Sequence, residues 1–271
     1  MYAPLNMKTI IFASFLLFSI QGHSQDINTI VAFGDSFTDN GHVNNHGFNR
    51  DSNGKIWIDY LAEMLDCDNL DNRAWGGART DSGHFTGLDW SGFNWQVDNY
   101  TMTTDPANTL FTIWIGINDY WDAKDDPTSS VLNIKTGIQK LIAKGAERFI
   151  IFNNFDLTVA PGYGPETEYH DLIPHVRVLV SEFNEEISQM IMNEETGLIA
   201  NHTHIEITFI DIYSFMNELI ANNKYMNTDT PWKDTYQFPH PDGFLWYDEW
   251  HPMTSCHFEI AELVHKKLEM R

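Results

Sequence analysis

The stretch INTIVAFGDSFTDNG, residues 27–41, carries the main fold signal of the chain. Its first part, Ile27–Phe33, is a short apolar run that ends at Gly34, and such a run is typical of a buried strand. The glycine turn that follows places Ser36 between this strand and a following helix. A strand that turns directly into a helix begins a βα unit, so the stretch predicts an α/β fold.

The same alternation of strand and helix continues along the chain. Alternating elements predict a parallel sheet covered on both faces, and right-handed crossovers then give a three-layer α/β/α sandwich. We expect a five-stranded parallel sheet in the flavodoxin-like order 2-1-3-4-5, within a single domain spanning residues 25–271. The further predicted strands are Leu70–Ala74, Thr109–Ile117, Arg148–Phe155 and His204–Ile212, and the predicted helices are Trp57–Leu65, Ser129–Gly145, Pro174–Thr196, Ser214–Asn222 and His257–Met270.

Residues 1–24 have the features of a secretory signal peptide. Lys8 precedes the apolar run Ile10–Ile20, and Gly22 and Ser24 have the spacing of small residues at a cleavage site. The run is too short to span a bilayer, so we expect no stable membrane insertion. The prediction is a secreted protein, extracellular or periplasmic, and an uncleaved N-terminal anchor is the alternative.

The composition excludes several classes of protein. Of the 271 residues, 42% are hydrophobic and 14% aromatic, so the chain is neither disordered nor collagen-like. Lys and Arg number 16 against 38 Asp and Glu, which gives a formal net charge of −22. This charge repels nucleic acid and anionic membranes, so we expect no nucleic-acid partner. We interpret the acidity as serving solubility, with steering of cationic substrates as the alternative.

Two cysteines and two glycosylation sequons leave open questions. Export would permit a bridge between Cys67 and Cys256, but two separate buried thiols fit equally well. Asn99 and Asn201 begin Asn-X-Thr sequons, which matter only in a eukaryotic host. The oligomeric state and the source organism cannot be read from the sequence.

A serine, a glycine and an asparagine follow the first three predicted strands. Ser36 would present its hydroxyl on the turn, Gly77 a backbone N–H, and Asn118 a side-chain amide. Each has an ordinary alternative: a helix N-cap, a tight loop or a polar strand end. If strands 2, 1 and 3 are neighbours, the three groups meet at one edge of the sheet. Three converging donors are what an oxyanion hole requires.

Near the C-terminus, the stretch WYDEWHPM, residues 246–253, places Asp248 three residues before His251. A carboxylate at that spacing can hold the Nδ1–H of the imidazole and leave Nε2 to take a proton from a serine. A surface histidine beside an aspartate is the alternative, and His240 is a rival that lacks an upstream carboxylate. The G-x-S-x-G motif of ordinary α/β-hydrolases is absent around Ser36, because Thr38 occupies the position of its second glycine.

Four segments together resemble the four sequence blocks of the GDSL (SGNH) hydrolase family, in the family's order. These segments are FGDSFTDNG (residues 33–41), NRAWGGART (72–80), GIND (116–119) and DEWHP (248–252). Phe37 replaces the leucine of the family name, and Met253 departs from the more usual threonine. The resemblance implies a nucleophile at Ser36, a base at His251, an orienting carboxylate at Asp248, and oxyanion donors at the Ser36 N–H, the Gly77 N–H and Asn118.

Members of this family hydrolyse acetylated carbohydrates, phospholipids and simple acyl esters. We therefore expect a secreted serine ester hydrolase that needs no cofactor or metal, with small acyl or acetyl esters, such as acetylated carbohydrates, as substrates. A lipolytic acyl hydrolase is the alternative, followed by a non-catalytic binding module or an adhesin on the same fold. His202 and His204 could be proposed as metal ligands, but no third ligand is evident. Six tryptophans are expected in or beside loops: Trp90, Trp95, Trp121, Trp232, Trp246 and Trp250. Their rings could contact sugars or acyl chains, but for most of them we favour packing in the core or the loops.

Overall fold

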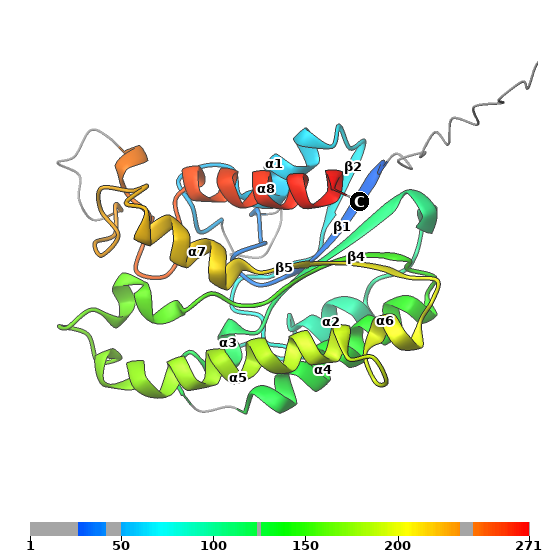
Figure 1. Ribbon diagram of the computed structural model, residues 1–271, viewed down its shortest axis with the longest axis horizontal. Coiled ribbons are helices and arrows are strands. Elements are labelled where there is room, and N and C mark those ends of the chain that lie inside the picture. Colours follow the sequence, from blue (N-terminus) through cyan, green and yellow to red (C-terminus); the bar gives the residue numbers. More distant parts are fainter. Residues whose placement is uncertain (1–26, 42–49, 124–125, 234–240, 271) are drawn as a thin grey trace, which may run out of the picture.

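Figure 1 shows the computed structural model of the chain, which describes residues 27–41, 50–123, 126–233 and 241–270. Five parallel strands form one sheet in the order β2-β1-β3-β4-β5, which confirms the predicted topology. The strands are β1 (Thr29–Gly34), β2 (Asn69–Asn72), β3 (Thr109–Trp114), β4 (Arg148–Phe152) and β5 (Glu206–Ile210).

The central strands lie in the middle of the molecule. Every residue of β1 and β3 is buried, and the two strands pair in register from Thr29 opposite Thr109 to Gly34 opposite Trp114. Strands covered on both faces are expected to be apolar along their whole length, as these two are. At one edge, β2 begins with the exposed Asn69. The carboxyl ends of β2, β1 and β3 therefore lie side by side.

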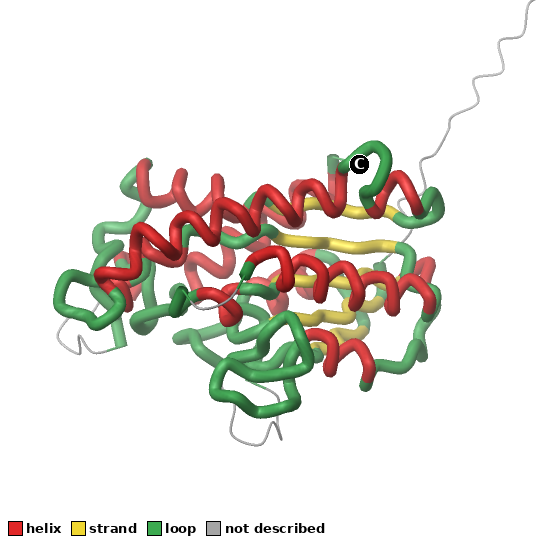
Figure 2. The backbone as a smooth tube through the Cα atoms, turned by 90° about the horizontal axis from the view of Figure 1, so that it is seen from below, coloured by secondary structure: helices red, strands yellow, loops and turns green. Residues whose placement is uncertain are grey.

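Helices cover both faces of the sheet. In Figure 1, α1 (Trp57–Met64) and α8 (Thr254–Glu269) lie above the strands, whereas α4 (Pro127–Ala143) and α5 (Ile173–Met192) lie below them. The view from below in Figure 2 shows the strands running behind these lower helices. The remaining helices are α2 (Phe93–Asp98), α3 (Ile117–Tyr120), α6 (Leu198–Asn201) and α7 (Ile212–Ala221).

Three short helices were not predicted, and one of them changes the expected position of a site residue. The prediction extended the third strand to Ile117, but β3 ends at Trp114. Gly116 has a φ of +128°, a conformation that glycine adopts and that ends the extended chain. Asn118 therefore lies in the first turn of α3 and not at the end of a strand. The others, α2 and α6, are too short to give a clear helical periodicity.

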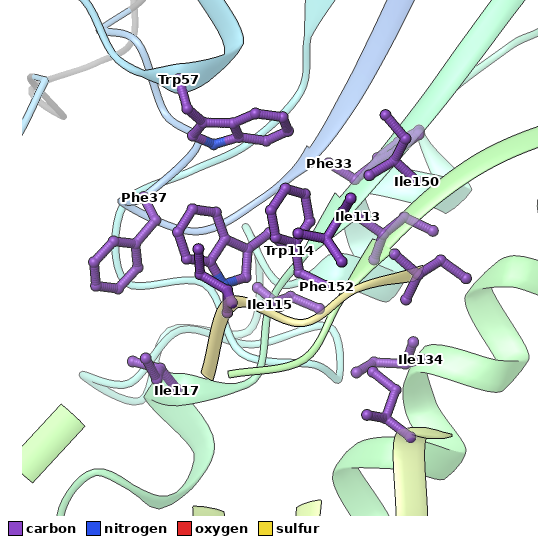
Figure 3. Close-up of a cluster of buried hydrophobic side chains, with 14 of the residues drawn as sticks. Phe33, Phe37, Trp57, Ile113, Trp114, Ile115, Ile117, Ile134, Ile150 and Phe152 are labelled. Atoms are coloured by element: carbon purple, nitrogen blue, oxygen red, sulfur yellow. The ribbon is translucent and has the colours of Figure 1, made fainter. Parts of the chain in front are cut away.

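A cluster of aromatic side chains supports the turn that follows β1 (Figure 3). Trp114 stacks on Phe152 with ring centroids 4.8 Å apart, and Phe37 stacks on Trp114 at 5.2 Å. Trp57 from α1 contacts both Trp114 and Phe152. Interiors packed this closely resist small displacements. The residue after Ser36 is thus anchored in the core.

Both cysteines are free, so the structure favours separate thiols over a bridge. The Cys67 thiol donates to the carbonyl of Ile27, and Cys256 is buried beside Met216. Within the described ranges, no helix is both long and apolar enough to cross a membrane. The predicted signal peptide and His240 lie outside the described residues.

Candidate active site

Ser36, His251 and Asp248 form one hydrogen-bonded chain. The Ser36 Oγ lies 2.8 Å from His251 Nε2, although the two residues are 215 positions apart in the sequence. On the other side of the ring, His251 Nδ1 lies 2.9 Å from Asp248 Oδ1 and 3.1 Å from Oδ2. A proton on Nδ1 is stabilised by the carboxylate, which leaves Nε2 as the acceptor for the serine hydroxyl. The structure therefore brings together the three residues singled out near the two ends of the chain.

The loop before α8 holds this geometry through its backbone. Asp248 Oδ1 accepts hydrogen bonds from the N–H groups of Trp250 at 2.9 Å and His251 at 2.8 Å. The N–H of Tyr247 donates to the His251 carbonyl at 2.7 Å. The imidazole ring also contacts Phe37, with centroids 5.4 Å apart. The aromatic core beneath Ser36 thus packs against the histidine as well.

The three predicted donors lie around the same cavity as Ser36 and His251. The backbone N–H groups of Ser36 and Gly77 donate to no described residue, so both are free to bind a ligand oxygen. Asn118 Nδ2 donates one hydrogen to the Ala78 carbonyl at 3.0 Å, which orients its amide and leaves the second hydrogen available. This arrangement can stabilise a negative charge on an oxygen bound beside Ser36.

His84 packs directly behind Gly77 and was not singled out from the sequence. A Cβ atom on Gly77 would lie only 2.1 Å from His84 Nε2, and the φ of Gly77 is +75°. His84 is held by Gly76 O at 3.1 Å from Nε2 and by Thr86 Oγ1 at 2.8 Å from Nδ1. Only glycine fits at position 77, because both the space and the backbone conformation exclude a side chain.

Two buried carboxylates fix the loops that carry the donors. Asp39 accepts the Gly76 N–H at 2.9 Å. Asp119, next to Asn118, accepts both the N–H of Thr80 at 3.0 Å and its hydroxyl at 2.5 Å. Burial raises the pKa of Asp119 to about 6, although these hydrogen bonds oppose the shift. The loops after β2 and β3 are therefore joined beside the cavity.

The charges around the imidazole favour its protonated form. Burial lowers the pKa of His251, but the hydrogen bond and charge of Asp248, with smaller effects of Asp51 and Asp35, outweigh burial and leave the pKa above its ordinary value. For Asp248, burial raises the pKa, but the hydrogen bond to His251 and further contacts leave it below its ordinary value. Both pKa shifts reflect the attraction between His251 and Asp248, which stabilises the ion pair of the two residues once Nε2 has accepted a proton.

A cavity of about 530 Å³ opens beside Ser36. Asp51, which no motif indicated, also borders it, with Oδ2 3.9 Å from His251 Nε2. Two of the six predicted loop tryptophans border the cavity, whereas Trp246 is buried in the core and Trp95 lies in α2. The apolar part of the wall consists of Phe37, Phe85, Ile117, Trp121, Leu157 and Trp250.

Among the described residues, one group of three potential metal-ligand side chains has its ligand atoms within 4.8 Å of one another: Asp51, Asp248 and His251. The hydrogen bonds from His251 to Asp248 account for the contact between these two residues without an ion. His202 and His204 do not belong to this group, and their rings are 6.0 Å apart. We therefore interpret the contact between Asp248 and His251 as a hydrogen bond of the candidate active site.

Comparison with known proteins identifies the family to which the chain belongs. The GDSL-like lipase/acylhydrolase family matches residues 30–264, so the chain belongs to this family. Thermolabile hemolysin of Vibrio parahaemolyticus is 26% identical over 273 residues, covering 87% of this chain. The chain spans only 62% of the length of that relative.

Solved structures share the fold. An α/β hydrolase enzyme from the metagenome of Lake Arreo, Spain, has a TM-score of 0.53 and 16% identity, covering 89% of this chain and 95% of its own. A putative arylesterase from Agrobacterium tumefaciens has a TM-score of 0.53 and 16% identity, covering 90% and 99%. At this identity the likeness concerns the fold alone.

Proposed function

We propose that the protein hydrolyses carboxylic esters through a covalent acyl-enzyme, with Ser36 as the nucleophile. The observation that carries this proposal is the 2.8 Å contact between Ser36 Oγ and His251 Nε2. The Ser36 oxygen attacks the ester carbonyl while Nε2 takes its proton, and Asp248 orients the ring and stabilises the imidazolium. The imidazolium then protonates the departing alcohol. Water repeats the sequence and releases the acid.

The negative charge of each tetrahedral intermediate falls on the former carbonyl oxygen. We assign its stabilisation to the N–H groups of Ser36 and Gly77 and to the Asn118 amide, which border one cavity with the nucleophile. One such donor contributes about 3 kcal/mol to transition-state stabilisation. The free backbone N–H groups and the oriented amide support this assignment, because no reorganisation is needed when the charge develops.

For the substrate, the sequence favours small acyl or acetyl esters, such as those of acetylated carbohydrates. A second candidate is a lipolytic acyl hydrolase, and the cavity wall favours it. Six apolar side chains line about 530 Å³, and an acetyl group fills little of that volume. Burying a longer chain against them stabilises binding by about 0.8 kcal/mol for each methylene group. A secreted binding module without activity is disfavoured, because each catalytic position is occupied by a competent residue.

We also propose that residues 1–24 are removed on export and that residues 25–271 form one domain. The charged start, the apolar run and the small residues before position 25 support a secreted enzyme. The net charge of −22 supports a neutral or cationic substrate, with no nucleic-acid partner.

A chain-length series tests the activity and the acyl preference together. We expect hydrolysis of p-nitrophenyl acetate, and Ser36→Ala abolishes it, whereas Ser130→Ala, a buried serine in α4, retains it. Full activity of Ser36→Ala would exclude this nucleophile. Acetyl, butyryl and octanoyl esters, acetylated xylan and phosphatidylcholine are then compared by kcat/KM. A maximum at acetyl supports the carbohydrate candidate, and a maximum at longer chains or lipid supports the lipolytic one.

A further inference from the structure

Asp51 faces the atom of His251 that moves the proton. Asp248 contacts the Nδ1 side of the ring, whereas Asp51 Oδ2 lies 3.9 Å from Nε2. The Asp51 side chain is 37% exposed and lines the cavity. It is therefore accessible to a substrate bound at Ser36, which distinguishes it from the enclosed carboxylate of Asp248.

This carboxylate has no close positive partner among the described lysines and arginines. Its neighbour Arg50 is used elsewhere: it lies 3.5 Å from Asp59 and donates to the carbonyls of Asn40 and Gly54. Lys233 exerts a weaker charge effect on Asp51, and its ammonium group lies over the ring of Tyr247 at 5.3 Å. While His251 is neutral, the negative charge of Asp51 is therefore left without a contact ion.

The rest of the cavity wall suits a cation. The described residues that line it include no lysine or arginine. Besides Phe37, which packs against the His251 ring, they include the aromatic residues Phe85, Trp121 and Trp250. Phe85 is 47% exposed, and its ring lies edge-on to Trp121, which in turn contacts Trp250. Aromatic faces attract quaternary ammonium groups, more strongly where the cation is shielded from water.

The reaction defines which part of the ester lies beside Asp51. The departing oxygen receives its proton from Nε2 and must lie about 3 Å from that atom. A carboxylate 3.9 Å from the same nitrogen therefore lies next to the alcohol part of the substrate. Because an ionised carboxylate only accepts hydrogen bonds, it attracts a cation there and repels an anion.

We propose that Asp51 and the aromatic side chains of the cavity wall bind an alcohol moiety that carries an ammonium group. This inference rests on the proposed function and adds a specificity-determining residue to it. The negative charge of the whole chain would draw such a substrate toward the cavity. An alcohol moiety that carries a phosphate or carboxylate in place of the ammonium group should be excluded.

A pair of isosteric esters isolates this effect. Choline esters and 3,3-dimethylbutyl esters have nearly the same shape and differ in charge, and both are prepared with the acyl group that the wild type hydrolyses fastest. We expect a kcat/KM about tenfold higher for the choline ester, consistent with a cation held by one carboxylate and aromatic rings. Asp51→Asn keeps the side-chain shape and should bring the ratio of the two kcat/KM values close to one.

Asp68→Asn is the matched control, because it removes the same charge from an exposed residue just before β2, at the amino end of the sheet. It should keep the wild-type ratio. If the charge of Asp51 acted only on the pKa of His251, Asp51→Asn would alter the hydrolysis of both esters equally. An Asp51→Asn variant with a shifted pH profile but an unchanged ratio of the two kcat/KM values therefore overturns the proposal. A preference for the 2-hydroxyethyl ester over both isosteres also overturns it. Failure of the wild type to hydrolyse any ester, p-nitrophenyl acetate included, would instead overturn the proposed function.

Discussion

Replacing Gly77 with alanine tests how the loop after β2 builds the proposed oxyanion site. The added Cβ would lie 2.1 Å from His84 Nε2, well inside van der Waals contact. The φ of Gly77 is +75°, which an alanine adopts only at a cost. His84 is buried and held on both nitrogens, so it cannot move aside without losing hydrogen bonds.

The expected magnitude follows from these contacts. The left-handed backbone costs about 1–2 kcal/mol for alanine. Displacing His84 removes two hydrogen bonds of about 1 kcal/mol each. The free energy of unfolding should therefore fall by about 3–4 kcal/mol. If the Gly77 N–H also moves away from the oxyanion position, kcat should fall by a factor of about 10²–10³.

The assay combines urea unfolding with steady-state hydrolysis of p-nitrophenyl acetate. Gly87→Ala is the control, because Gly87 has a φ of +88° and nothing within 4 Å of an added Cβ. It carries the backbone cost without the clash, so its stability should fall by only about 1–2 kcal/mol. His84→Ala combined with Gly77→Ala removes the clash, and the two changes should be strongly non-additive.

Three results would refute this reasoning. If Gly77→Ala matched Gly87→Ala in stability, the contact between the added Cβ and His84 would contribute nothing to the loss of stability. If Gly77→Ala retained the wild-type kcat, the Gly77 N–H would not be an oxyanion donor. Additive effects in the double variant would also contradict a steric coupling between the two residues.

Two further predictions concern pH. His251 must be neutral to accept a proton, and its pKa is raised, so kcat/KM should rise with pH to a midpoint above about 6.5. Asp248→Asn should lower both the rate and the midpoint of the pH-rate profile, and an unchanged midpoint would contradict the pairing of Asp248 with His251. Burial raises the pKa of Asp35 to about 7, so the contribution of the neutral carboxyl group to the free energy of unfolding is lost as pH rises from about 4 to 7. Asp35→Asn should reduce this loss when urea unfolding is measured across the same pH range. An unaltered pH dependence of the stability would argue against the raised pKa.

Much of the fold could be predicted because its signals are local. The apolar runs at β1 and β3 and the helical periodicity of α4 and α5 arise within single stretches of chain. The contact between Asp248 and His251 is local too, since the residues are three apart. For the same reason the ends of elements were less accurate: the break at Gly116 depends on one backbone angle, and Asn118 consequently lies in a helix.

The order of the four motifs, together with a parallel sheet in the order 2-1-3-4-5, was sufficient to expect Ser36, Gly77 and Asn118 at one edge. Their chemistry could be inferred because strand order brings the carboxyl ends of neighbouring strands together. The hydrogen bond from Ser36 to His251 was expected from the spacing of Asp248 and His251 and from the resemblance to the GDSL family, although 215 positions separate the two residues.

The sequence by itself thus determined the class of fold and the residues that we propose to react, because periodicity, turns and short motifs are properties of continuous chain. Only the tertiary structure decided what surrounds them. Asp51 and His84 belong to no motif, and each acquires its importance from a contact with His251 or Gly77 across the cavity. Such contacts depend on the packing of distant segments, which no local pattern of residues specifies.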